Sequence, residues 1–371
     1  MSADLLITNA RIFDGSRLLD LGWISKTGDT WKVGSESPGD AIEVIDGEGG
    51  FVTTPLVDTH VHGGGGFSAE KGVDDMRGVI DFHAAHGVGR TALSLMTDSL
   101  EALEDQILCA HEITDSRFSG LHLEGPYLSP DFRGCHPPSL LARPKTRDLQ
   151  HLIDIARGIV KSMTIAPELF SAEQLTLLTR SGIQLCLGHT SADYALCHDF
   201  FTHYGTVMTH AFNAMPGIHH RNPGPVPAAL DTDAYTELIA DGHHVDPAAA
   251  RLLNPEKVIL VTDAMSATGQ PDGDYRVGAT PVTVRERVAR DQTGSLAGST
   301  LLLHHAVTNY AAWIHSPELA LRAAVTNPAK AYGDEPPTLS GTVLLWDQDL
   351  SLRRVLDMSP GHPREPTAPP N

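Results

Sequence analysis

Histidines and carboxylates that follow apolar, β-branched segments are the residues of this sequence best suited to chemistry. His60 and His62 form a His-x-His pair after one such segment, and Glu124, His189 and His210 each follow another. Imidazoles and carboxylates are the ligands that Zn²⁺ and similar divalent ions bind, and three protein ligands with an open position characterise a catalytic site. We therefore expect Glu124, His189 and His210 to hold a catalytic divalent ion.

The His-x-His pair leaves the number of ions open. Alternate side chains of a β-strand point to the same face, so His60 and His62 can converge on one ion. Alone, such a pair is weak evidence, because two hydrogen-bonded polar residues at a barrel rim give the same pattern. If a second ion binds, His60 and His62 hold it and Glu124 bridges the two ions. We expect Zn²⁺, as one or two ions, with Fe²⁺ or another divalent ion as the alternative.

Asp263 ends the apolar segment VILVTD and is the candidate catalytic acid and base. Next to a metal-activated water, an aspartate in this place can take a proton and later donate it. The structural alternative is an aspartate that caps the segment after it.

These residues require a scaffold that gathers the ends of several strands. The eight apolar, strand-like segments are 55–60, 89–95, 120–124, 161–166, 183–188, 206–210, 237–241 and 257–263. Stretches of helical periodicity lie between them, at 74–86, 99–113, 146–157, 171–181, 192–203 and 246–253. This alternation predicts an α/β fold with a closed (β/α)8 TIM barrel rather than an open doubly wound sheet, and a barrel carries its chemistry at the C-terminal ends of the strands.

The remaining segments surround the barrel, which we expect to span 53–339. Residues 1–52 form short strands that we expect to join 340–358 in a small β-sandwich domain. A hairpin is predicted within 275–298, and the Pro-rich end, 359–371, is predicted to be a disordered tail.

Composition excludes several classes of function. The 371 residues carry a formal net charge of −19 without a cluster of Lys and Arg, so nucleic acid is not an expected partner. We find neither a basic start followed by an apolar stretch nor an apolar run of about 18 residues, and we expect a cytoplasmic protein without a membrane partner. Cys109, Cys135, Cys186 and Cys197 form no CxxC pair, which favours reduced thiols.

Six segments together resemble one family of enzymes: VDTHVHG, GLHLEGPYLSP, LGHTSA, MTHAFNAMP, ADGHHVD and LVTDAMSATG. They are similar to the N-acetylglucosamine-6-phosphate deacetylases of the amidohydrolase superfamily, and HLEGPY and THAFNAMP are the most specific of them. The resemblance implies hydrolysis of N-acetyl-D-glucosamine 6-phosphate to D-glucosamine 6-phosphate and acetate. It implies that Glu124, His189 and His210 are the metal ligands and that Asp263 is the general base and acid.

The resemblance also implies a set of contacts to the amino-sugar phosphate. Arg221 matches the phosphate-binding arginine of the family, and its guanidinium group suits a phosphate dianion. The other matched positions are His136, Asn213, Ala214, Asp241, His244, Leu296, Ala297 and Gly298. Cys135, beside His136 in the loop 131–139, departs from the family pattern and is a candidate substrate contact. An incidental thiol is the alternative for Cys135. The family further implies a homodimer in which Arg221 and His244 reach into the neighbour's site.

Other histidines have simpler interpretations. His122 shares the barrel-facing side with Glu124, and an interior hydrogen-bonding role is favoured over metal binding. For His83, His86, His304 and His305, on expected helices, surface or packing roles are favoured.

Two other functions remain open at this point. The first is an amidohydrolase that acts on a cyclic amide or an N-acyl amino acid, because fold and metal cluster do not determine the substrate. Arg221 and the segment FNAMP argue against it. The second is a non-catalytic barrel that binds a sugar phosphate, which the complete ligand set and Asp263 argue against.

Overall fold

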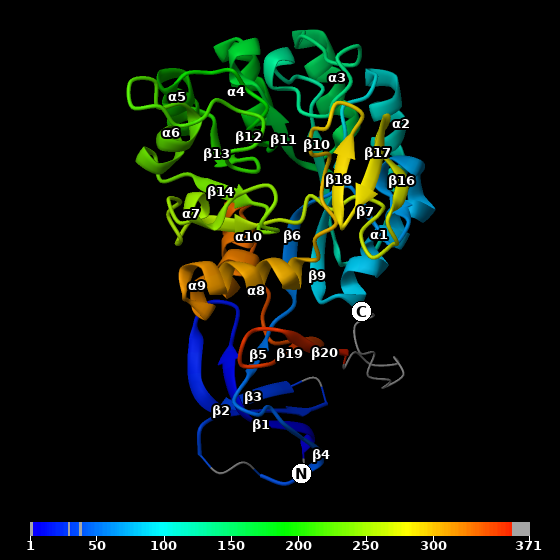
Figure 1. Ribbon diagram of the computed structural model, residues 1–371. Coiled ribbons are helices and arrows are strands. Elements are labelled where there is room, and N and C mark those ends of the chain that lie inside the picture. Colours follow the sequence, from blue (N-terminus) through cyan, green and yellow to red (C-terminus); the bar gives the residue numbers. More distant parts are fainter. Residues whose placement is uncertain (1–2, 29, 37–38, 358–371) are drawn as a thin grey trace.

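The computed structural model describes residues 3–28, 30–36 and 39–357 (Figure 1). Its central sheet has eight parallel strands in the order β15-β14-β13-β12-β11-β10-β9-β6. The strands are β6 (Leu56–Val61), β9 (Val88–Leu95), β10 (Phe118–Glu124), β11 (Val160–Ile165), β12 (Gln184–Leu187), β13 (Gly205–Met208), β14 (Tyr235–Leu238) and β15 (Val258–Leu260). Each matches one predicted segment, and the predicted barrel is confirmed.

The barrel closes between β6 and β15 at the end that carries the candidate ligands. Val61 and Ala264 form a parallel bridge across the gap. The amide of Asp263 donates to the carbonyl of His60, and the amide of His62 donates to the carbonyl of Ala264, both at 2.9 Å. The backbone thereby fixes Asp263 beside the His-x-His pair.

Helices cover the outside of the barrel (Figure 1). They are α1 (Val73–Ala85), α2 (Leu100–Ala110), α3 (Thr146–Ala156), α4 (Ala172–Arg180), α5 (Tyr194–His203), α6 (Pro225–Asp231), α7 (Pro247–Ala250), α8 (Leu303–Ile314), α9 (Pro317–Ala324) and α10 (Thr326–Ala331). The short 3-10 helices are Ala69–Lys71, Pro130–Phe132 and Pro167–Leu169. Local signals start several of them: Ser171 and Gln174 form a capping box at α4. In the described residues, no helix is both long and apolar enough to cross a bilayer.

Strands from both ends of the chain share a seven-stranded sheet below the barrel in Figure 1. They are β1 (Ala3–Phe13), β2 (Leu18–Thr27), β3 (Thr30–Gly34), β4 (Ala41–Asp46), β5 (Phe51–Thr53), β19 (Thr342–Trp346) and β20 (Leu352–Asp357). β19 pairs with β5, and the Trp346 indole donates to Thr53 Oγ1 at 2.9 Å. This sheet has its own aliphatic core, built around Ile7, Ile12 and Leu345. The domain boundaries stay a prediction, and the predicted tail lies outside the described residues.

The predicted hairpin within 275–298 is incomplete, because three strands form there: β16 (Gly273–Val277), β17 (Thr280–Arg285) and β18 (Val288–Asp291). The turn between β17 and β18 consists of Glu286 and Arg287, whose φ angles are 51° and 64°. Such a turn normally contains Asn or Gly. Here the carboxylate of Asp272 accepts hydrogen bonds from the backbone amides of both residues. Because Asp272 is distant in sequence, no local sequence signal marked the turn.

A two-stranded turn follows the first barrel strand: β7 (Gly63–Gly64) pairs with β8 (Phe67–Ser68). Gly65 and Gly66 between them have φ angles of 64° and 93°. Glycine adopts this conformation at low cost, so the four-glycine run 63–66 can form this turn.

Candidate metal and active site

The candidate ligands lie together at the C-terminal mouth of the barrel. They are delivered by different strands: His60 and His62 from β6 and the residue after it, Glu124 from the end of β10, His189 and His210 after β12 and β13, and Asp263 after β15. All six are buried.

Glu124, His189 and His210 converge on one point. Glu124 Oε1 lies 3.1 Å from His189 Nε2 and 3.0 Å from His210 Nε2, and the two imidazole nitrogens are 3.1 Å apart. His189 Nδ1 is 2.9 Å from the carbonyl of Phe132 and must donate to it, which leaves the lone pair on Nε2 in the neutral ring. Three ligand atoms that face one another in this way suit a shared cation.

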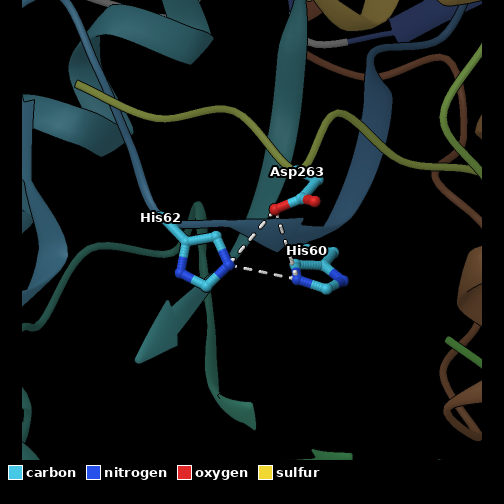
Figure 2. A group of neighbouring side chains, drawn as sticks. All are labelled: His60, His62 and Asp263. Atoms are coloured by element: carbon cyan, nitrogen blue, oxygen red, sulfur yellow. Dashed lines mark hydrogen bonds and ion pairs between the residues drawn. The ribbon is translucent and has the colours of Figure 1, made fainter. Parts of the chain in front are cut away.

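A second group, formed by His60, His62 and Asp263, adjoins the first through Glu124, and Figure 2 shows its three side chains. His60 Nε2 and His62 Nε2 are 3.2 Å apart, and Asp263 Oδ1 lies 3.6 Å and 3.3 Å from them. Glu124 Oε2 is 3.2 Å from His62 Nε2, while its other oxygen faces His189 and His210. The Glu124 carboxylate therefore joins both groups, as a bridging ligand must.

The charges of these groups favour a cation among them. Burial opposes protonation of His60, but the attraction of Asp263, Glu124 and Glu237 outweighs it and raises the pKa of His60 to about 10. For Glu124, burial alone would raise the pKa, but His136 and the neighbouring imidazoles lower it well below its usual value. Ionised carboxylates this deeply buried require compensating positive charge, which either imidazolium protons or a divalent ion can supply.

The backbone turns sharply where three of these residues leave their strands. His189, His210 and Asp263 have φ angles of 46°, 26° and 49°. This region is unfavourable for residues other than glycine, and such strain is concentrated at functional sites. The strain here accompanies side chains that turn back over the barrel mouth.

Comparison with known proteins decides the family. No family model matches the chain. It is 34% identical to N-acetylgalactosamine-6-phosphate deacetylase of Escherichia coli O157:H7 over 85% of this chain and 88% of that protein. It is 33% identical to N-acetylglucosamine-6-phosphate deacetylase of Vibrio furnissii over 75% of this chain and 73% of that protein. The chain belongs to the N-acetylglucosamine-6-phosphate deacetylase family.

A solved structure of this deacetylase family agrees. The N-acetyl-D-glucosamine-6-phosphate deacetylase of Mycobacterium smegmatis, in a mutant complexed with N-acetyl-D-glucosamine-6-phosphate, superposes with a TM-score of 0.88 at 33% identity. The match covers 96% of this chain and 98% of that chain. These comparisons confirm the resemblance inferred from the six segments. They also confirm the amidohydrolase fold and the class of enzyme, a hydrolase that acts on amides.

The loop around His136 covers the deacetylase site. His136 is buried, with Nε2 3.4 Å from Glu124 Oε2 and Nδ1 2.8 Å from Thr97 Oγ1. Its neighbour Cys135 is half-buried, and its carbonyl accepts from Thr280 Oγ1 of the inserted sheet. Burial raises the pKa of the Cys135 thiol, and the nearby carboxylates of Glu124 and Asp263 add to this, so the thiol stays protonated at neutral pH.

The predicted substrate contacts are of two kinds: residues with polar side chains, and residues that offer mainly backbone groups. Asp241 accepts from the amides of His243 and His244 at 2.8 Å and lies 2.7 Å from His244 Nδ1, which makes a rigid half-buried pair. Asn213 uses its amide to donate to the carbonyls of His210 and Ala211 at 3.2 and 3.1 Å, so its side chain holds the loop after β13.

The other predicted contacts offer mainly backbone groups. Ala214 has a φ angle of 49° in the same loop as Asn213. Ala297 is fully buried and its amide donates to Ala289 of the inserted sheet, while Leu296 and Gly298 flank it. Gly298, with φ 63°, approaches the carbonyl of Asp263 closely, where a Cβ would lie 3.1 Å from that oxygen.

Arg221 is not gathered into this mouth. It lies in the exposed turn 219–222, and its guanidinium is 2.9 Å from His220 Nε2. Among the residues that the structure describes, no carboxylate forms an ion pair with it. Apart from the contact with His220, its guanidinium group is exposed to solvent.

Sequence reasoning missed two carboxylates behind the His-x-His pair. Glu237 in β14 contacts His60, with Oε2 3.2 Å from Nδ1, and Glu70 Oε1 lies 3.8 Å from His62 Nδ1. The only signal for Glu237 was a charged residue at the start of an apolar barrel strand. By contrast, His122 bonds Ser94 and Thr164 through its two nitrogens, which agrees with the interior role favoured for it.

Proposed function

We propose that this protein hydrolyses N-acetyl-D-glucosamine 6-phosphate to D-glucosamine 6-phosphate and acetate, in amino-sugar catabolism. One observation carries the proposal: Glu124, His189 and His210 face one another within 3.1 Å, with Asp263 beside them, in a chain of the deacetylase family. The proposal includes a cytoplasmic location, where free thiols such as Cys109 persist.

The donor set fits a divalent ion, because buried imidazole nitrogens and carboxylate oxygens, the atoms that such ions bind, face one another. Glu124, His189 and His210 would hold the catalytic ion, Zn²⁺ in this proposal or Fe²⁺ as the alternative, and His60 and His62 would hold a second. When bound, the ion would lower the pKa of its water to near neutral.

Asp263 moves the protons of the reaction. Burial raises its pKa, but His60 and His62 lower it below its usual value, so Asp263 is a carboxylate at neutral pH and can accept the proton of the attacking water. The carbonyl carbon of the acetamide gains the water oxygen, and the C–N bond then breaks. Asp263 returns the proton to the departing nitrogen, which leaves as the amine.

In this proposal His136 stabilises the acetamide oxygen. Thr97 Oγ1 donates to the carbonyl of Glu124 at 3.1 Å, so it accepts from His136 Nδ1–H. Nε2 of His136 then carries a proton only in the imidazolium form. In that form it can donate to the oxygen as negative charge develops there.

The sugar phosphate would be bound by basic side chains and loop backbone. Arg221 and His244 are the phosphate contacts in this proposal, and the protein acts as a homodimer in which they reach into the partner's site. The exposed position of Arg221 supports this arrangement. In a chain of net charge −19, a guanidinium group aimed at the phosphate also offsets repulsion of the dianion. The remaining pocket contacts are Cys135, Asn213, Ala214, Asp241, Leu296, Ala297 and Gly298.

Acetate release from a panel of sugars tests the proposal. The panel contains N-acetylglucosamine 6-phosphate, its galactosamine epimer and both free sugars, with zinc content measured on the same sample. The epimer is the second candidate substrate, because one relative at 34% identity is an N-acetylgalactosamine-6-phosphate deacetylase. We expect rapid release from the glucosamine phosphate. No acetate release from N-acetylglucosamine 6-phosphate by zinc-containing protein would contradict the proposal.

A further inference from the structure

A buried carboxylate stands behind the first histidine of the His-x-His pair. Glu237 in β14 is 1% exposed, and its Oε2 lies 3.2 Å from His60 Nδ1. Its other oxygen accepts from Tyr332 OH at 3.2 Å and from Thr59 Oγ1 at 3.4 Å. Among the residues described by the structure, His60 is the sole ion-pair partner of Glu237. Burial of a carboxylate at this depth, with one imidazole as its ion-pair partner, is energetically costly and suggests a functional role.

The contact determines which nitrogen of His60 is free. An ionised carboxylate only accepts hydrogen bonds, so His60 Nδ1 must carry the proton. In the neutral ring the lone pair is then on Nε2, which faces His62 and Asp263 (Figure 2). A carboxylate that orients an imidazole in this way also makes it a stronger metal ligand.

No other imidazole of the cluster has this support. Within the described ranges of the chain, the Nδ1 atoms of His62 and His210 have no hydrogen-bond partner. Glu70 is 3.8 Å from His62 Nδ1, beyond hydrogen-bond distance. His189 Nδ1 donates to a neutral backbone carbonyl. The difference singles out His60 as the ligand whose orientation is built into the barrel core.

We propose that Glu237 is a positioning residue that holds the proton of His60 on Nδ1 and thereby sets the affinity of the His60–His62 pair for a divalent ion. This inference rests on the metal site of the proposed function. It assigns the buried charge of Glu237 to ion binding rather than to fold stability.

Glu237→Gln is an informative substitution because the amide has a preferred orientation. Tyr332 and Thr59 both donate toward the Oε1 position, so the amide oxygen stays there and the NH2 group faces His60 Nδ1. His60 then accepts at Nδ1 and carries its proton on Nε2, where the ion would bind. Shape and volume are almost unchanged, so the effect is confined to hydrogen-bond polarity and charge.

The experiment titrates metal-free protein with Zn²⁺ against a chelator and resolves each binding constant. We expect Glu237→Gln to weaken one Zn²⁺ constant by about 10- to 100-fold. Tyr332→Phe is the matched control and should leave both constants within about threefold, because it removes a donor on the far side of the carboxylate. In the Tyr332→Phe background the amide can turn its oxygen toward His60, so adding Glu237→Gln should cost clearly less than in the wild type. Unchanged constants in Glu237→Gln, or an equal loss in both backgrounds, would overturn the proposal.

A spectroscopic measurement decides the matter even if the variant does not fold. In zinc-loaded wild-type protein labelled with ¹⁵N-histidine, His60 should show a proton on Nδ1, identified by its loss in His60→Asn. A proton on Nε2 of His60 would contradict the proposal without any Glu237 variant. Complete absence of both Zn²⁺ and Fe²⁺ binding by the wild type would instead refute the metal site and with it the proposed function.

Discussion

Glu124 Oε1 lies 3.0 Å from His210 Nε2, although the two residues are 86 positions apart and leave barrel strands that are separated by two others. The contact exists because parallel strands present all their C-terminal ends at one mouth of the barrel. It also brings together an acceptor-only carboxylate and an imidazole whose other nitrogen, Nδ1, is buried without a hydrogen-bond partner in the part of the chain that the structure describes. Binding of one cation by both side chains is the simplest use of this pair.

Replacement of Asp263 tests the proton transfer. Asp263→Asn keeps the size of the side chain but cannot accept the proton of the water, so we expect kcat to fall by about 10²- to 10⁴-fold. Zinc content and the circular dichroism spectrum should match the wild type. Full activity with normal zinc content would remove Asp263 from the mechanism.

Replacement of Arg221 tests the phosphate contact. Arg221→Ala should raise KM for the phosphorylated sugar by about 10- to 100-fold, as expected for loss of hydrogen bonds to a charged group. Activity on free N-acetylglucosamine should hardly change, because that sugar has no phosphate. Arg221→Lys is the control that keeps the charge but not the planar fork. A preference for the phosphorylated sugar equal to that of the wild type would contradict the assignment.

Mixed dimers test whether Arg221 acts across the interface. Neither Asp263→Asn nor Arg221→Ala chains should turn over the substrate well alone. After the two are unfolded and refolded together, a hybrid dimer contains one site with an intact Asp263 and an Arg221 supplied by the partner. We expect activity to recover in the mixture; no recovery, with dimers demonstrated by sedimentation, would place Arg221 in its own chain's site.

His210 and His122 form a matched pair for the metal prediction, because both are buried imidazoles of the barrel interior. His210→Asn should lower zinc content, since it removes a ligand from the Glu124 group. His122→Gln should keep the zinc content and instead lower the free energy of unfolding by about 1–3 kcal/mol, because Ser94 and Thr164 lose a buried partner. Zinc loss in His122→Gln and not in His210→Asn would reverse the two assignments.

The buried imidazole of His83 should make the free energy of unfolding depend on pH. Burial lowers its pKa to about 4, although its Nε2 donates to the carbonyl of Gly63 at 3.0 Å. Between this value and the ordinary value near 6.5, the unfolded chain binds the proton and the folded chain does not, so stability falls as the pH falls through this window. From pH 7 to pH 5 the loss is about 2 kcal/mol, at 1.36 kcal/mol per pH unit over 1.5 units.

Urea unfolding at the two pH values, on wild type and His83→Gln, measures this contribution. The glutamine amide can still donate to Gly63 but does not titrate. The variant should therefore lose about 2 kcal/mol less than the wild type between pH 7 and pH 5. The same loss in both proteins would assign the pH dependence to other groups, such as His304, whose pKa burial lowers to about 3.

Much of the barrel could be predicted because each strand and helix has its own local pattern of apolar and polar residues. Each strand is an apolar run that ends in a polar residue, and the helices between strands show their own periodicity. The sequence alone therefore assigns five residues to strand ends: His60, Glu124, His189, His210 and Asp263. The convergence of these side chains then follows from closure of the barrel rather than from any one segment.

The parts that escaped prediction depend on contacts between distant segments. Glu237 is simply the third residue of a strand in sequence, and its role depends on His60, 177 positions away. The turn at Glu286 and Arg287 is stabilised by Asp272 instead of by glycine or asparagine. The proposed reach of Arg221 into a partner's site would involve a second chain, which no pattern within one sequence encodes.

Metal dependence of acetate release tests the central claim most directly. Protein freed of metal by a chelator should release no acetate from N-acetylglucosamine 6-phosphate, and addition of Zn²⁺ or Fe²⁺ should restore turnover in the wild type but not in Glu124→Gln. Undiminished acetate release by protein shown to contain no metal would contradict the account.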